Sequence, residues 1–167
     1  MKRVAVLMAK GYEEGETLTI VDLLRRANIE CHTFYFDNEF VEGMHHMMIK
    51  ADQKFGDEIK DYDVLVLPGG RPGGENLRNN EDVIQMVQYF NQHHKILAAM
   101  CSGTIVLSDA QVIEGKKVTG YTGYEEKLKG GLFQNDVVVY DQNIITSQGP
   151  ATPYPFAFQI IEALGQD

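Results

Sequence analysis

The chain has 167 residues, of which 44% are hydrophobic and 23% are charged, and its formal net charge is −9 at pH 7. This length and composition predict one globular domain, residues 1–167, with a substantial core. The acidic balance argues against nucleic acid or an anionic membrane as the main partner, because both bind basic surfaces. No apolar stretch approaches the roughly 18 residues that a membrane-spanning helix needs. Two cysteines, Cys31 and Cys101, are too few for a disulfide framework.

The N-terminal residues run directly into a short apolar segment, 4–9, which Lys10 and a group of glutamates follow. This order differs from a targeting segment, which ends in a small-residue cleavage site. We therefore expect a first strand here and a cytoplasmic protein.

Continuous apolar runs alternate along the chain with segments of helical periodicity. The predicted strands are 4–9, 30–36, 63–67, 96–100 and 117–119, with a hairpin of 136–140 and 143–147 around Asp141-Gln142. The predicted helices are 17–28, 81–92, a segment ending at 110, and 153–164, with short helical turns at 57–61 and 125–129 and a hairpin within 40–52. Glycines and Pro72 extend a loop over 69–74.

Alternating strands and helices, with several strands apolar throughout, are typical of a mostly parallel sheet covered by helices on both faces. Ligands of such sheets bind at the carboxyl ends of the strands. Three loops meet this condition: 11–16, 69–74 and 100–103.

Cys101 lies where the apolar run 96–100 ends and the next helix begins. A strand-to-helix elbow is the geometry with which hydrolases present a nucleophile. The nearby helix N-terminus favours the thiolate. The alternative is a buried cysteine that only packs.

The other two loops supply an acid and backbone N–H groups. Glu16, at the start of a helix, is placed to hold a proton beside Cys101 or to move one during a reaction. Gly69 and Gly70 are expected to expose their N–H groups to a developing oxyanion, together with the N–H of Ser102. The alternatives are a solvated glutamate at a helix start and glycines that serve turn geometry alone. Glu13 and Glu14 fit the solvated alternative better.

None of the five histidines follows Cys101 in the sequence. A Cys–His pair would need one of them to arrive from elsewhere in the fold. His93 and His94 end a helix before the cysteine's strand and are expected at the surface. The segment His45-His46-Met47-Met48 has soft-metal side chains, but neighbouring histidines without a further ligand do not predict a metal site.

Four motifs occur in register: 10–17 (KGYEEGET), 66–70 (VLPGG), 98–103 (AAMCSG) and 146–150 (TSQGP). With them the chain resembles the ThiJ/PfpI superfamily over residues 4–164, and within it the branch of the parkinsonism-associated deglycase. The resemblance implies a flavodoxin-like three-layer α/β sandwich with a mostly parallel central sheet, and a homodimer. It implies that Cys101 is the nucleophilic and oxidisable cysteine, that Glu16 is its protonated partner, and that Gly69, Gly70 and Ser102 line an anion pocket.

Two positions depart from the family pattern. The family's pocket histidine falls on Tyr121, and tyrosine is a poor base near neutral pH because its free pKa is about 10. The arginine that often precedes the family's Gly-Pro is Gln148 here. A protease or an amidotransferase would need histidine directly after the cysteine or further downstream, and neither position holds one.

The resemblance therefore implies a cofactor-free enzyme, of the glyoxalase III or deglycase type, that acts on small reactive aldehydes or glycated adducts. Cys101 would attack the carbonyl, Glu16 would move protons and Tyr121 would orient the substrate. The alternative is a redox-responsive or chaperone-like stress protein in which Cys101 is oxidised to a stabilised sulfinate.

Overall fold

A computed structural model describes residues 1–165. Its centre is a seven-stranded sheet in the order β10-β11-β7-β6-β1-β2-β5. All neighbouring strands are parallel except β10 and β11, which form an antiparallel hairpin. The strand bounds are β1 Arg3–Leu7, β2 Glu30–Tyr35, β5 Gln53–Lys54, β6 Val64–Leu67, β7 Ile96–Met100, β10 Val138–Asp141 and β11 Ile144–Ser147. This confirms the predicted α/β fold with a mostly parallel central sheet.

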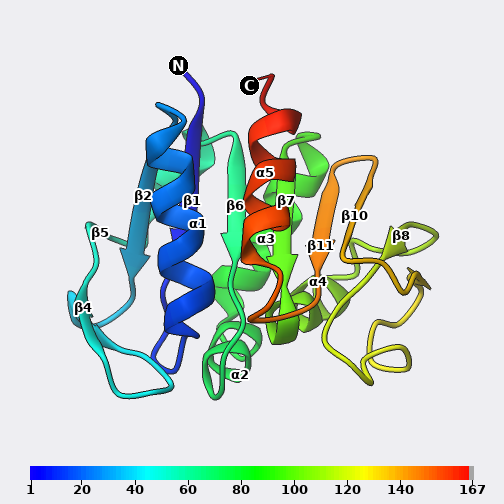
Figure 1. Cartoon of the computed structure of the whole chain (residues 1–167), viewed down its shortest axis with the longest axis horizontal. Helices are drawn as coiled ribbons and strands as arrows, with labels where there is room; N and C mark the ends of the chain where they lie inside the picture. Colours follow the sequence, from blue (N-terminus) through cyan, green and yellow to red (C-terminus); the bar gives the residue numbers. More distant parts are fainter. Residues whose placement is uncertain (166–167) are drawn as a thin grey trace.

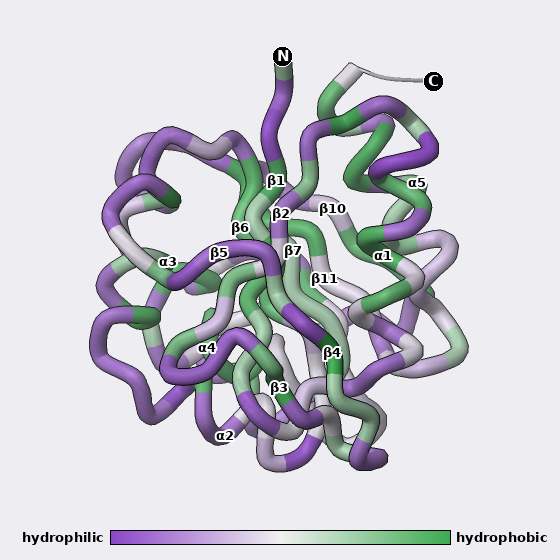
Figure 2. Tube along the Cα trace, turned by 90° about the vertical axis from the view of Figure 1, so that its left-hand side faces the viewer, coloured by the Kyte–Doolittle hydropathy of each residue, from purple (hydrophilic) through white to green (hydrophobic). Residues whose placement is uncertain are grey.

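Helices cover both faces of the sheet (Figure 1). α1 (Glu14–Arg26) and α5 (Pro153–Ala163) pack side by side on one face, and α3 (Glu81–Gln92) and α4 (Thr104–Asp109) lie on the other. β6 and β7 are apolar throughout, and β6 is buried along its whole length. In Figure 2 the central strands form the hydrophobic interior, while hydrophilic colour lies on the outer helices and loops.

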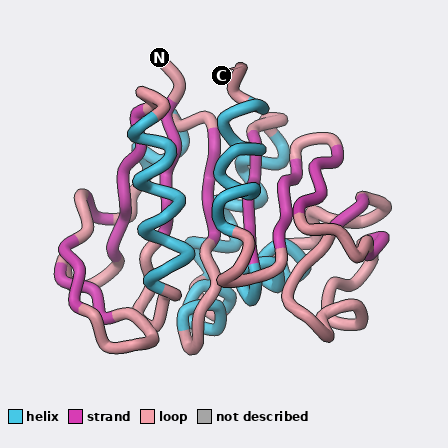
Figure 3. Tube along the Cα trace, in the orientation of Figure 1, coloured by secondary structure: helices cyan, strands magenta, loops and turns pink. Residues whose placement is uncertain are grey.

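Two small sheets flank the main one. β3 (Phe40–Glu42) and β4 (Met48–Lys50) form the hairpin that was expected within 40–52. β8 (Lys117–Val118) pairs in parallel with β9 (Leu132–Phe133). The sequence did not predict β9, because a strand of two residues is too short to show a periodic pattern. Long loops connect β8, β9 and β10 on this side of the molecule (Figure 3).

Three local predictions differ from the structure. The first helix begins at Glu14 rather than at residue 17, because the Glu13 side chain accepts the Gly15 N–H and caps it. The loop expected over 69–74 ends at Pro72, because helix α2 (Gly73–Arg78) begins at Gly73, and its two glycines allow close backbone contacts. Segment 125–129 forms turns instead of a helix, between Gly123 and Gly130, which both have positive φ. The turn at 57–61 is a 3₁₀ helix, η1 (Asp57–Asp61), as expected.

Both ends of the described chain lie at one end of the sheet, opposite α2 (Figure 1). The carboxyl ends of β1, β6 and β7 point the other way, toward α2. Among residues 1–165, no helix combines the length and the apolar character that crossing a bilayer requires.

Candidate active site

Cys101 lies at a sharp elbow between β7 and α4. Its φ is +56°, a left-handed conformation that residues other than glycine rarely adopt. A short 3₁₀ turn, η2 (Cys101–Gly103), leads into α4, and the Thr104 hydroxyl donates to the Cys101 carbonyl at 2.7 Å. The predicted strand-to-helix elbow is confirmed, with the strained conformation on the cysteine itself.

The thiol faces a cavity of about 110 Å³ at the carboxyl ends of the strands. The three predicted loops all reach it, and Glu16, Gly70, Cys101, Ser102 and Tyr121 line it as expected. Gly69 lies directly behind, where an added Cβ would come within 2.6 Å of the Cys101 Cβ. The sequence motifs therefore converge on one small site.

Glu16 is the buried acid of this cavity, with no exposed surface. Its Oε1 accepts the N–H of Gly69 at 3.0 Å, and its Oε2 has no hydrogen-bond partner among the described residues. Burial raises the pKa of the carboxyl to about 7, against the bond from Gly69 that lowers it. A carboxyl with this pKa can hold or release a proton near neutral pH.

The Cys101 thiol is 8% exposed and lies within hydrogen-bonding reach of Glu16. Burial, followed by the negative charge of Glu16, raises the pKa of the thiol to about 12, while the Ser102 N–H lowers it. The backbone N–H at the start of the helical turn thus favours the thiolate, as expected, but burial and the charge of Glu16 oppose it more strongly. Sulfur can carry negative charge once Glu16 holds the proton, because the opposing carboxylate charge is then gone.

The two glycine N–H groups are already engaged. Gly69 donates to Glu16, and Gly70 donates to the Ser102 Oγ at 2.9 Å, while that hydroxyl donates back to the Gly70 carbonyl. The prediction that both glycines expose free N–H groups to an oxyanion is therefore wrong for this structure. The Ser102 N–H, which faces the Cys101 sulfur, remains as a donor.

Glu13 and Glu14 are buried, contrary to the expectation that they are solvated. Glu14 accepts the backbone N–H groups of His45 and Met47 and lies 2.9 Å from the His45 ring nitrogen. Burial raises the pKa of the Glu14 carboxyl, but its own backbone N–H together with these bonds outweighs burial and holds the pKa below its usual value. The carboxylate thereby fixes the loop that places Met44 in the cavity wall.

Glu13, Glu14 and His45 bring potential metal ligands within 4.8 Å of one another. Backbone N–H groups already occupy both carboxylates, through the cap at Gly15 and the loop contacts of Glu14. A cation here would have to displace these donors, so the cluster is better described as the anchor of the hairpin loop. His46 is exposed and lies 2.9 Å from Glu42.

Sequence reasoning did not assign four further cavity residues besides Glu13. They are Met44, Arg71, Tyr124 and Pro150. Arg71 lies in the loop 69–74, which the sequence predicts to reach the ligand-binding edge of the sheet, so its position in the chain was the one signal for it. Met44 and Tyr124 come from segments whose approach to the site depends on tertiary packing, and no local pattern indicates them.

Glu16 makes stability depend on pH. Its folded-state pKa is raised, so the folded state holds this proton more tightly than the unfolded chain, and stability is lost as pH rises from about 5 through about 7. We expect Glu16→Gln to gain about 2 kcal/mol relative to wild type between pH 5 and pH 8. Denaturant unfolding at both pH values measures this difference. Glu162→Gln, at an exposed position, is the control. If the free energy of unfolding of Glu16→Gln changed with pH in parallel with that of wild type, the raised pKa would be contradicted.

Comparisons with known proteins agree with this fold. The sequence model described as DJ-1/PfpI family matches residues 2–163. The zebrafish Parkinson disease protein 7 homolog is 35% identical over 169 residues, covering 98% of this chain and 89% of its own. The crystal structure of Drosophila melanogaster DJ-1beta superposes with a TM-score of 0.92 at 32% identity, covering 98% of this chain and 90% of that one. Toxoplasma gondii DJ-1, solved in an oxidized form, has a TM-score of 0.92 at 29% identity, with 98% and 91% covered. Because the family model matches nearly the whole chain and a relative is 35% identical over almost its full length, this chain belongs to the DJ-1/PfpI family.

Proposed function

We propose that the protein is a cysteine-dependent, cofactor-free enzyme of the glyoxalase or deglycase type. The observation that carries this proposal is the pairing of Glu16 with Cys101 in one small cavity. The acid has an unbonded oxygen and a pKa near neutrality, and the sulfur faces the Ser102 N–H. A nucleophile, a proton carrier and an oxyanion donor are therefore side by side.

The proposed first step is addition of the Cys101 sulfur to an aldehyde carbon. A C–S bond forms, the carbonyl π bond breaks, and the thiol proton ends on the new hydroxyl, giving a hemithioacetal. Glu16 relays this proton, and the Ser102 N–H stabilises the negative oxygen before the proton arrives. With methylglyoxal, Glu16 then moves a proton from the first carbon to the second while the hydroxyl proton passes from the first oxygen to the second, which gives a thioester. Water adds to this thioester and the C–S bond breaks, releasing lactate and the free Cys101 thiol.

Tyr121 occupies the position at which the family carries histidine. Its side chain is 39% exposed and packs edge-on against Tyr124, with 5.8 Å between ring centroids. A phenol hydroxyl at the mouth of the cavity can donate a hydrogen bond to the substrate, so we assign Tyr121 to orienting it. The proton transfer is left to Glu16.

The test is lactate formation from methylglyoxal by the purified protein without added thiol, since free thiols scavenge aldehydes. We expect turnover by wild type and a loss of at least about a hundredfold in Glu16→Ala, because general acid–base groups typically contribute that much. Glu162→Ala is the matched control. Turnover that survives unchanged in Glu16→Ala would contradict the assigned role.

A second candidate is a redox-responsive protein. Cys101 borders a cavity, whereas Cys31 is 3% exposed and its pKa is raised to about 12 by burial. Two equivalents of peroxide would oxidise the Cys101 sulfur to a sulfinate and be reduced to water, with the Ser102 N–H and protonated Glu16 donating to its oxygens. Mass spectrometry after mild peroxide tests this, and oxidation of Cys31 with Cys101 unmodified would contradict it.

We further propose that the protein is a cytoplasmic homodimer, on the basis of the family resemblance.

A further inference from the structure

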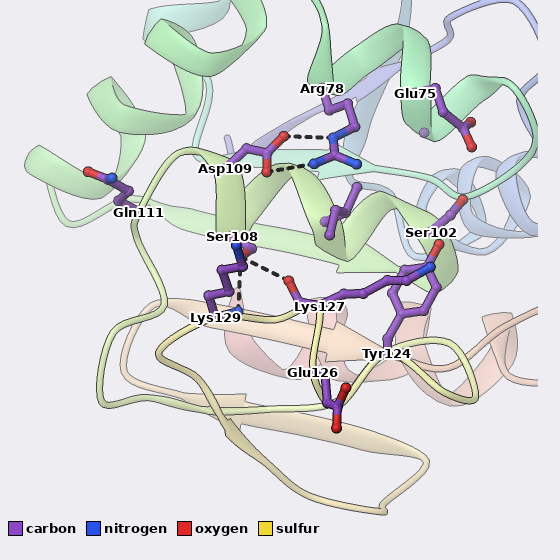
Figure 4. A pocket seen from close by; sticks show the side chains of 12 residues that line it. Glu75, Arg78, Ser102, Ser108, Asp109, Gln111, Tyr124, Glu126, Lys127 and Lys129 are labelled. Carbon is purple, nitrogen blue, oxygen red and sulfur yellow. Dashed lines mark hydrogen bonds and ion pairs between the residues drawn. The ribbon is translucent and has the colours of Figure 1, made fainter.

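A second, larger cavity of about 520 Å³ adjoins the Cys101 cavity. α2, α4 and the turns at 124–129 surround it (Figure 4). Two residues, Ser102 and Tyr124, line both cavities. A molecule that reacts at Cys101 therefore has a place to extend on the other side of Tyr124.

Tyr124 is the boundary between the two spaces. It is 9% exposed, and its hydroxyl points toward Ser102 (Figure 4). Burial raises the pKa of this phenol, so it stays neutral and can donate a hydrogen bond at the junction. The junction is thus polar and uncharged on the tyrosine side.

Lys127 supplies a positive charge at the same junction. Its amino group lies 4.8 Å from the centroid of the Tyr124 ring, and Figure 4 shows its side chain reaching toward Ser102. In the described part of the chain, no carboxylate forms an ion pair with this amino group. A cation held on an aromatic face without a counter-ion is suited to an anionic ligand.

The acidic residues of the cavity do not neutralise this charge. Asp109 is paired with Arg78 at 2.7 Å in a two-bond contact. Glu126 points away from the Lys127 amino group (Figure 4), and Glu75, which also lines the cavity from α2, forms no ion pair with it. Lys129, on the same turn, adds a second positive charge to the lining.

We propose that this second cavity is a subsite for the anionic tail of the substrate, so that the preferred substrates are aldehydes carrying a carboxylate on a short chain. The inference rests on the proposed reaction at Cys101. The aldehyde carbon binds at the sulfur, the chain passes Ser102 and Tyr124, and the carboxylate pairs with Lys127. Methylglyoxal, which has no charge, would use only the first cavity.

The test measures protection of Cys101 from alkylation by iodoacetamide, followed by mass spectrometry, which requires no turnover. Succinic and glutaric semialdehydes are compared with butanal and pentanal, their uncharged counterparts. We expect the better semialdehyde to protect at about tenfold lower concentration than its counterpart in wild type and in Lys2→Gln, a control at the opposite end of the sheet. In Lys127→Gln this preference should fall to about one.

An unchanged preference in Lys127→Gln, or equal protection by charged and uncharged aldehydes in wild type, would overturn the subsite. Protection of the expected kind without any lactate formation would instead overturn the proposed enzyme and leave the subsite standing. Circular dichroism establishes that Lys127→Gln is folded, as its exposed position leads us to expect.

Discussion

Replacing Cys101 by alanine is expected to lower methylglyoxal consumption at least about a thousandfold, to the rate of the buffer. The substitution removes the sulfur that is proposed to bond to the aldehyde carbon, and loss of a covalent nucleophile typically has effects of this size. The fold should survive, because alanine is smaller than cysteine and the replaced side chain borders an existing cavity. Measured consumption in buffer without thiols, together with the melting temperature, separates loss of chemistry from loss of structure.

Cys31→Ala is the matched control. Cys31 lies in β2 beneath α1, away from the cavity, so its replacement should keep the rate while costing some stability through lost packing. Equal rates in wild type and Cys101→Ala would remove the cysteine from the reaction altogether. Equal loss in both cysteine variants would point to a general effect on folding rather than to a nucleophile.

Gly103→Ala is expected to destabilise the protein by about 3 kcal/mol or more, even though alanine is normally the better residue in helical backbone. Gly103 has an ordinary helical φ of −63°, so conformation does not demand glycine there. The lack of space requires glycine at this position, because an added Cβ would come within 2.2 Å of the Leu67 carbonyl oxygen and 2.6 Å of the Pro68 carbonyl oxygen. Backbone on β6 cannot move away without disturbing the central sheet.

Denaturant unfolding of Gly103→Ala measures this cost, and Gly15→Ala is its control. An added Cβ on Gly15 would lie 3.4 Å from the Glu13 carboxylate oxygens, an ordinary contact, and the residue is inside α1. We expect that variant to be neutral or up to about 1 kcal/mol more stable. A Gly103→Ala variant as stable as wild type would contradict this prediction, because it would show that the elbow accommodates the added Cβ without cost.

The strands and the elbow were predictable because their signals are local. Continuous apolar runs identified β1, β6 and β7, and the change from apolar strand to small residues located Cys101 at the turn. Helix α2 was missed because Gly73 and Gly74 indicate loop by propensity. Their absent side chains instead let α2 approach Gly11 and Ser102, a packing requirement that no local pattern carries.

The chemistry of the site was less predictable than its position. The sequence placed Glu16 beside Cys101, but how their protons are shared depends on burial, which only the folded structure gives. Glu14 was expected in solvent because acidic residues favour helix starts, yet a loop 31 residues away donates to its carboxylate. The engaged N–H groups of Gly69 and Gly70 likewise depend on partners from other loops.

The position of the two chain ends has a practical meaning. Residue 1 and residue 165 leave the same side of the sheet, while the Cys101 cavity lies at the other. A purification tag, a fluorescent protein or a second enzyme can thus be joined on this side without covering the entrance of the cavity.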